Sequence, residues 1–318
     1  MRFLHVFAAV AGLSLVIGAS ASAQQADEEI VVTGQRLREA AHQYAETIAL
    51  APARADQYAR WSARLCPSIA GLAPSEAQTL IDHMALRARE VGVEAERSGC
   101  SPNLIIIFAP DANRLAREIV DTRRDLMGYY TADDVVTAGR EALEEFATSA
   151  RPVRWWHVSR TVTADGRQLA DTDSRVGRGT ADALAAAQGR PNEAAGLGNG
   201  LRGVEATRSQ GTRTRRATRQ DFSFALVIVD APSVSRFAPA QVADYLAMAA
   251  LVQLNPDADL SAFPSILNLF QSPETAPPGL TEWDRAYLQG LYSATREAAN
   301  ATRHRADIAR RIAENVAQ

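Results

Sequence analysis

The segment from residue 222 to residue 254 constrains the fold more than any other part of the chain. Residues 222–229 (FSFALVIV) form an apolar run whose length and composition are typical of a buried strand. Pro239 then opens a predicted helix over 240–254 that is apolar on nearly every face. A helix of this kind must lie inside a domain, so this segment predicts a core in which strands and helices pack together.

Two further strands and one long loop are predicted around this core. Residues 103–108 (NLIIIF) lie between two prolines and are rich in β-branched side chains, which favours a buried strand. A second strand is predicted at 153–162 and leads into a turn at 164–166. Residues 171–220 are rich in Gly, Ala, Ser, Thr and Arg, which predicts a long loop.

Helices are predicted where apolar spacing and capping residues coincide. The expected ranges are 37–50 with an extension over 51–64, 73–91, 112–120 capped by Asp111, 131–146, 281–292 capped by Thr281, and 294–315. The predicted fold class is therefore α+β, with a single domain over residues 37–318.

The first 23 residues have the pattern of an export signal. Arg2 gives a positive start, residues 3–17 are mostly apolar, and Ala21 and Ala23 supply the small residues that signal peptidase requires. The apolar run is shorter than the roughly 20 residues that a membrane span needs. We therefore predict cleavage after Ala23, a periplasmic or secreted protein of a Gram-negative envelope, and no integral membrane segment after cleavage.

Composition excludes several classes of protein. All 34 basic residues are Arg, against 37 acidic residues, and the formal net charge of the 318 residues is −3. A dedicated nucleic-acid-binding protein usually carries a strong basic excess, which is absent here. A charged fraction of 22% and a hydrophobic fraction of 47% argue against a polytopic membrane protein and against a fully disordered chain.

Cys66 and Cys100 are the only cysteines in the chain. An oxidising compartment favours joining such a pair, and their spacing is not the C-x-x-C of a redox or metal site. The sequence therefore predicts a structural disulfide.

Two short motifs follow the buried helix. The first is Pro264–Asn268 (PSILN), and the second is Leu280–Asp284 (LTEWD), which leads to Leu291 and Tyr292. In this order of strand, helix, turn and closing helix, the chain from residue 222 resembles the catalytic half of zincin metalloproteases of the metzincin kind, and related secreted bacterial families of unknown function. The resemblance implies a zincin-like mixed sheet with packed helices and extra N-terminal helices.

The zinc ligands of that family are missing from this sequence. Where the resemblance places HExxH, the chain reads YLAMA, and the degenerate zinc-helix positions are Tyr245, Leu246 and Ala249. Zinc needs three or four N, S or O donors, which leucine, methionine and alanine side chains cannot supply. We therefore expect no metal, no cofactor and no catalytic residues, and a protein that has lost the family's activity. The alternative is a peptidase or cell-wall hydrolase with an unrecognised site.

Residues 24–36 form a predicted flexible, polar tail with one β-prone island. The island resembles the TonB box of outer-membrane TonB-dependent receptors in these residues: Glu29, Ile30, Val31, Val32, Thr33 and Gly34. In those receptors the segment is an extended strand that pairs with a sheet edge of TonB. The resemblance implies TonB, or another envelope protein, as a partner, and the alternative is a tail without one. Deleting residues 24–36 should abolish binding to a purified TonB periplasmic domain, and unchanged binding would refute the hypothesis.

Arginines gather at the end of the predicted loop. The cluster consists of Arg213, Arg215, Arg216 and Arg219. Guanidinium groups hold phosphates and carboxylates through paired hydrogen bonds. The cluster therefore predicts an anion-binding module for lipopolysaccharide or acidic lipid headgroups, and the alternative is a solvated loop.

The four histidines that follow the predicted cleavage site complete the set of candidate chemical groups. His42, His83 and His304 are expected on solvated helix faces, and His157 on a half-buried strand beside Trp155. No G-x-S-x-G motif accompanies them, which disfavours a serine hydrolase of the α/β type. The leading functional prediction is thus a non-catalytic interaction protein of the bacterial cell envelope.

Overall fold

The computed structural model describes residues 20–50, 55, 57–128, 135–167 and 211–317, with side chains from residue 34 onward. The chain forms two compact units, residues 1–40 and 41–318. Residues 1–19 of the predicted export signal and residues 171–210 of the predicted loop lie outside the described residues. In the described part of the chain, no helix combines the length and the apolar content that a membrane span needs.

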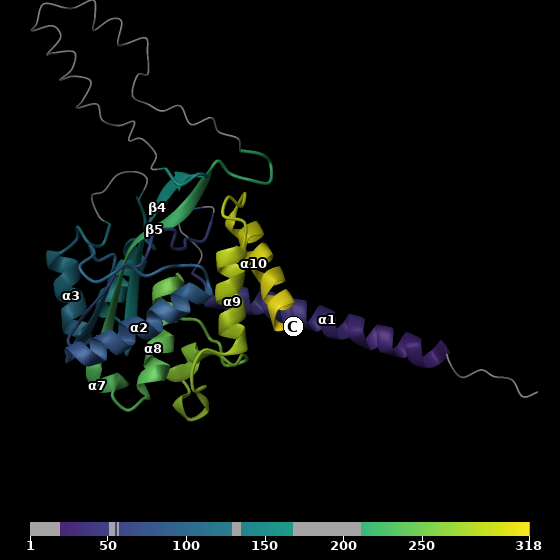
Figure 1. Cartoon of the computed structure of the whole chain (residues 1–318), viewed down its shortest axis with the longest axis horizontal. Helices are drawn as coiled ribbons and strands as arrows, with labels where there is room; N and C mark the ends of the chain where they lie inside the picture. Colours follow the sequence, from purple (N-terminus) through teal and green to yellow (C-terminus); the bar gives the residue numbers. More distant parts are fainter. Residues whose placement is uncertain (1–19, 51–54, 56, 129–134, 168–210, 318) are drawn as a thin grey trace, which may run out of the picture. The chain divides into compact units, whose positions relative to one another are not determined.

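A mixed five-stranded sheet forms the centre of the second unit (Figure 1). The strands are β1 (Pro67–Ala70), β2 (Leu104–Ala109), β3 (Val135–Val136), β4 (Val153–Thr163) and β5 (Thr218–Asp230). Their order is β1-β2-β5-β4-β3, in which β1, β2 and β5 are parallel, and β4 runs antiparallel to both β5 and β3. The apolar runs at 103–108 and 222–229 are thus neighbours at the centre of the sheet, and the predicted α+β class is confirmed.

Eight α-helices and two short 3-10 helices are among the described elements. They are α1 (Ser20–Ile48), α2 (Pro74–Glu90), α3 (Ala112–Thr122), α4 (Arg140–Thr148), α7 (Ala231–Val234), α8 (Pro239–Leu251), η1 (Ile266–Leu269), η2 (Pro273–Thr275), α9 (Glu282–Ser293) and α10 (Ala301–Val316). The predicted caps hold two of them in place. The Asp111 side chain accepts from the backbone N–H of Arg114, and Thr281 accepts from that of Asp284.

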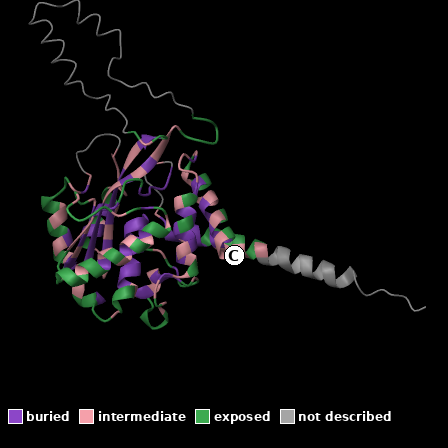
Figure 2. Ribbon diagram, in the orientation of Figure 1, coloured by how far each residue is buried: buried purple, intermediate pink, exposed green. Residues whose placement is uncertain are grey.

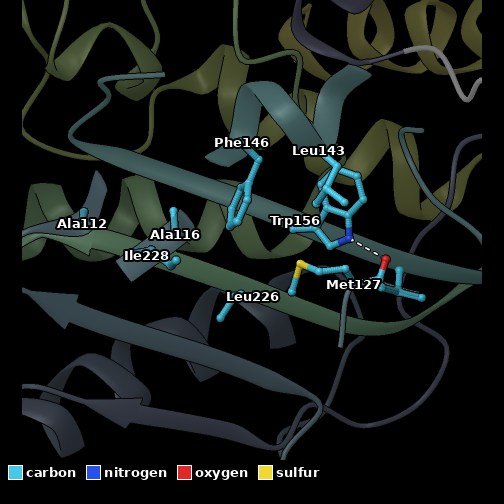
Figure 3. Packing of buried hydrophobic residues seen from close by; sticks show 9 residues of the cluster. Ala112, Ala116, Met127, Leu143, Phe146, Trp156, Leu226 and Ile228 are labelled. Carbon is cyan, nitrogen blue, oxygen red and sulfur yellow. Dashed lines mark hydrogen bonds between the residues drawn. The ribbon is translucent and has the colours of Figure 1, made fainter. Parts of the chain in front are cut away.

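Apolar side chains fill both faces of the sheet, because successive residues of a strand point to opposite sides. On one face, Trp156 and Ile228 pack against α3 and α4, together with Phe146 and Met127 (Figure 3). The Trp156 Nε1 donates to the Met127 carbonyl at 3.1 Å. On the other face lies α8, in which every residue from Val242 to Leu251 is buried, as predicted for this helix (Figure 2).

The disulfide between Cys66 and Cys100 is present, with Cα atoms 6.0 Å apart, which confirms the predicted pairing. It joins the residue before β1 to the segment before β2. Backbone hydrogen bonds reinforce this link, since Leu65 bonds to Glu94 and Glu96 at 2.9 and 2.7 Å.

Three predicted helix boundaries are wrong, each because another interaction determines the backbone. Residues 57–64 are not helical, since Arg60 forms a bridge with Asp221 of β5. Residues 131–134 of the helix predicted at 131–146 lie outside the described residues, and its described part is helical only from Arg140, because Gly139 has a φ of 97° and Val135–Val136 pair with β4. The last helix begins at Ala301 rather than near 294, where Asn300 caps it.

Residues 24–36, predicted as a flexible tail with one β-prone island, lie within α1. The side chains of residues 29–33 are outside the described set. An extended strand at the TonB-box-like segment would require this part of α1 to unwind. The partner suggested by that segment stays a prediction.

Candidate anion-binding site

The degenerate zinc-helix positions on α8 are part of the apolar core. Leu246 and Ala249 are fully buried, and the Tyr245 ring contacts the rings of Trp155 and Phe270 at 6.4 and 4.7 Å between centroids. Burial raises the pKa of the Tyr245 phenol, so this side chain stays neutral. Among the described residues, no group of three or more His, Cys, Asp or Glu side chains could hold a metal ion.

The two short motifs after α8 meet at one buried carboxylate, that of Asp284. Its Oδ1 accepts from the hydroxyls of Ser265 at 2.6 Å and Tyr44 at 2.9 Å, and its Oδ2 accepts from the backbone N–H groups of Ile266 and Thr281. The PSILN and LTEWD motifs thus fix the turn before η1 to the start of α9 and to α1. Their role in this chain is structural.

A second buried carboxylate, Asp244, is the one charged group of α8. It accepts from His83 Nε2 at 2.6 Å, from Arg87 Nε at 2.7 Å and from the Leu280 N–H at 2.8 Å. A Cβ on Gly279 would lie 2.6 Å from Asp244 Oδ2, so only glycine permits this approach. His83 is therefore a partner of a buried ion cluster between α2 and α8, and its prediction as a solvated residue is wrong.

Two other histidines are buried and neutral. His304 is 1% exposed and accepts from the Tyr58 N–H at 3.1 Å, which corrects the prediction of a solvated face. His157 is 5% exposed and stacks on Phe222 with ring centroids 4.6 Å apart. Burial lowers the pKa of each to about 4. His42 is exposed, as predicted.

Six arginines come from segments that contact one another, and we call this group the arginine patch. It consists of Arg213, Arg215, Arg216, Arg219, Arg296 and Arg303. The predicted cluster supplies the first four, and the other two come from the α9–α10 connection and from α10. Arg213, Arg215, Arg216 and Arg303 are exposed, whereas Arg219 and Arg296 are partly buried.

Backbone contacts fix the predicted cluster against the C-terminal helices. Arg216 donates its N–H to the Glu297 carbonyl at 2.7 Å and its Nε to the Ala299 carbonyl at 3.1 Å. Arg303 Nη1 donates to the Arg213 carbonyl at 3.2 Å. Residues 213–217 therefore form a largely exposed loop whose backbone position is set by contacts with the α9–α10 connection, and residues 218–219 begin β5.

At its inner end the patch concentrates positive charge around a serine hydroxyl. Arg296 Nη1 donates to Ser62 Oγ at 2.6 Å, and Arg219 Nη2 lies 3.5 Å from the same oxygen. Arg219 also forms an ion pair with Asp221, at 2.9 Å. No carboxylate of the described residues forms an ion pair with Arg296. Burial, and then the charge of Arg219, lower the pKa of Arg296.

A third guanidinium, that of Arg60, lies beneath this pair. It is 4% exposed and donates to the carbonyls of Leu291 and Ala294 at the end of α9, where a helix attracts cations. Burial, and then the charge of Arg296, lower its pKa to about 10. Of these three guanidinium groups, only that of Arg219 forms an ion pair with a carboxylate of the described residues, that of Asp221. Positive charge is therefore in surplus here.

A pocket of about 260 Å³ opens beside Ser62. Its walls are residues 61–64 and 91–94, with Tyr292 and Arg296 at its side. Arg64 and Glu94 line it as an ion pair at 2.9 Å. The arrangement suits an anion that would accept hydrogen bonds from Arg296 and Ser62, which both line the pocket.

Comparison with protein-family models, with curated proteins and with solved structures finds no match to this chain. The zincin resemblance therefore stays a hypothesis about the sequence. Sequence reasoning found Arg219 through its local cluster but missed Arg60, Ser62 and Arg296. Their meeting depends on separations of 157 and 234 residues, for which no local pattern exists.

Proposed function

We propose that this protein is an exported, non-catalytic binding protein that attaches to anionic groups of the bacterial cell envelope through the arginine patch. The observation that carries the proposal is the gathering of guanidinium groups on segments that contact one another. Arg213, Arg215 and Arg296 form no ion pair with a carboxylate of the described residues, although the whole chain carries a net negative charge. Basic residues near an anionic membrane surface each contribute about 1 kcal/mol to attachment.

The alternative of an enzyme has less support. Polar groups converging in a cleft beside α8 would favour it, but Asp244 is enclosed by His83, Arg87 and Leu280, which already use its oxygens. The rest of α8 packs against apolar side chains. A loss of catalytic chemistry agrees with the missing zinc ligands. The TonB-box-like segment adds a proposed protein partner, independent of the arginine patch.

Co-sedimentation with lipid vesicles tests the proposal. The protein should bind vesicles that contain phosphatidylglycerol but not vesicles of phosphatidylcholine, and binding should weaken from low salt to about 0.5 M, because salt screens exposed charges. The double variant Arg213→Gln/Arg215→Gln should lose most of this binding. The matched control Arg117→Gln/Arg124→Gln removes two exposed arginines of the α3 region and should bind as the wild type does. Equal losses in both variants, or binding that ignores lipid charge, would refute the proposal.

A further inference from the structure

The inner end of the arginine patch, around Ser62, differs from the rest in two ways. It lies beside a pocket, and its hydrogen-bond donors have fixed positions. Arg213 and Arg215 present their charges to solvent without a defined geometry. By contrast, Arg296 and Arg219 approach the Ser62 hydroxyl from two segments, and Ser62 and Arg296 line the 260 Å³ pocket. A surface of free charges attracts any anion, whereas donors at fixed positions select for shape.

The donors around Ser62 match a group with several acceptor oxygens. Each guanidinium presents several N–H groups in a fixed plane, and the Ser62 hydroxyl keeps its own proton for donation while it accepts from Arg296. A carboxylate has two oxygens to offer, whereas the terminal phosphate of a monoester has three. The pocket volume lies just below the roughly 300 Å³ at which small-molecule sites begin, so it suits a headgroup and not a large ligand.

The pocket is also held in shape by covalent and backbone links. Its two walls, 61–64 and 91–94, are joined by the hydrogen bonds of Leu65 to Glu94 and Glu96 and, a few residues away, by the Cys66–Cys100 disulfide. Such a pre-formed site loses little freedom on binding, which favours affinity. Glu94 is the one acidic residue of the lining, and it is paired with Arg64.

We propose that the Ser62 pocket binds a single phosphate monoester group, held by Arg296 and Ser62, with the positive charge of Arg219 beside Ser62. This inference rests on the proposed function, since it assigns the ligand class of the inner end of the same patch. The phosphate belongs either to a lipid headgroup or to a free phosphate compound, and the test separates the two sources.

Isothermal titration of the disulfide-intact protein with glycerol 3-phosphate and with inorganic phosphate tests the inference. Arg296→Gln and Ser62→Ala should each weaken binding about tenfold or more, because each removes a hydrogen bond to a charged group. Glu94→Gln should strengthen it, because Arg64 is then released toward the phosphate. Arg213→Gln/Arg215→Gln should keep the wild-type affinity for both probes, although it loses vesicle binding.

Two outcomes would overturn the inference: no heat of binding in the wild type at millimolar phosphate, or wild-type affinity in both Arg296→Gln and Ser62→Ala. Neither outcome depends on vesicle binding, so the inference can fail while the proposed function stands, and the reverse also holds. A preference for phosphatidic acid over phosphatidylglycerol vesicles, abolished by Ser62→Ala, would identify a lipid headgroup as the source. Phosphate binding without that preference would identify a free phosphate compound.

Discussion

Asp244 and Asp284 are buried carboxylates that join segments far apart in the sequence. Asp244 connects α8 to α2 and to Leu280, and Asp284 connects α9 to the turn before η1 and to Tyr44. A buried ion is stable only when its partners satisfy it, so removal of one partner has a large effect. At the scale of single residues, these partners explain why α8 and α9 each contain a buried aspartate.

Asp244→Asn should lower the free energy of unfolding by about 3 kcal/mol, because the amide leaves the Arg87 charge without its buried partner. Urea denaturation at pH 7 measures the effect. The exposed Asp121→Asn is the matched control and should change stability by less than about 0.5 kcal/mol. Equal stability of Asp244→Asn and the wild type would show that the charge of this carboxylate is not needed.

Elements whose ends are marked in the sequence were predictable, and elements that depend on distant partners were not. Asp111 and Thr281 cap α3 and α9 where the sequence predicts it. The two residues of β3 have strand geometry only because they pair with β4, and Arg60, within the predicted helical extension, instead forms a bridge with Asp221 of β5. Local propensity cannot reveal either interaction.

At the element scale, the disulfide should stabilise the start of β1 against β2. Its loop spans a sequence separation of 34, so Cys66→Ser/Cys100→Ser should lower the free energy of unfolding by about 2–4 kcal/mol. Urea denaturation with and without reductant measures this. Reductant should bring the wild type to the stability of the variant and leave the variant unchanged. A variant as stable as the oxidised wild type would contradict the prediction.

At the scale of the whole molecule, the candidate site lies where parts of the chain meet. Four of its arginines stand together in the sequence, and the anion site predicted from them stays a prediction. The depth of that site was not predictable, because Ser62 and Arg296 come from segments more than 200 residues apart and meet only through the fold. The histidines give a similar result. The sequence places them on helices and on a strand, but it does not show that two of them are buried.

These buried groups predict how the whole fold responds to acid. His157 and His304 have a pKa of about 4 in the folded protein against 6.5 in an unfolded chain, so between these values only the unfolded state takes up their protons. Stability should therefore fall as pH decreases from about 6.5 to 4, by up to about 1.4 kcal/mol per pH unit for each histidine. The pKa values of Asp244 and Asp307 are lowered, that of Asp307 to about 2. Their contribution is present above about pH 4 and is lost as pH falls further.

Urea denaturation at intervals from pH 7.5 to pH 3 would reveal the two stages. His157→Phe keeps an aromatic ring against Phe222 but removes one titrating group, so its loss of stability between pH 6.5 and 4 should be smaller than that of the wild type. His42→Asn is the control, because His42 is exposed, and it should follow the wild-type profile. If His157→Phe also followed the wild-type profile, the protonation of a buried His157 could not be a source of acid sensitivity.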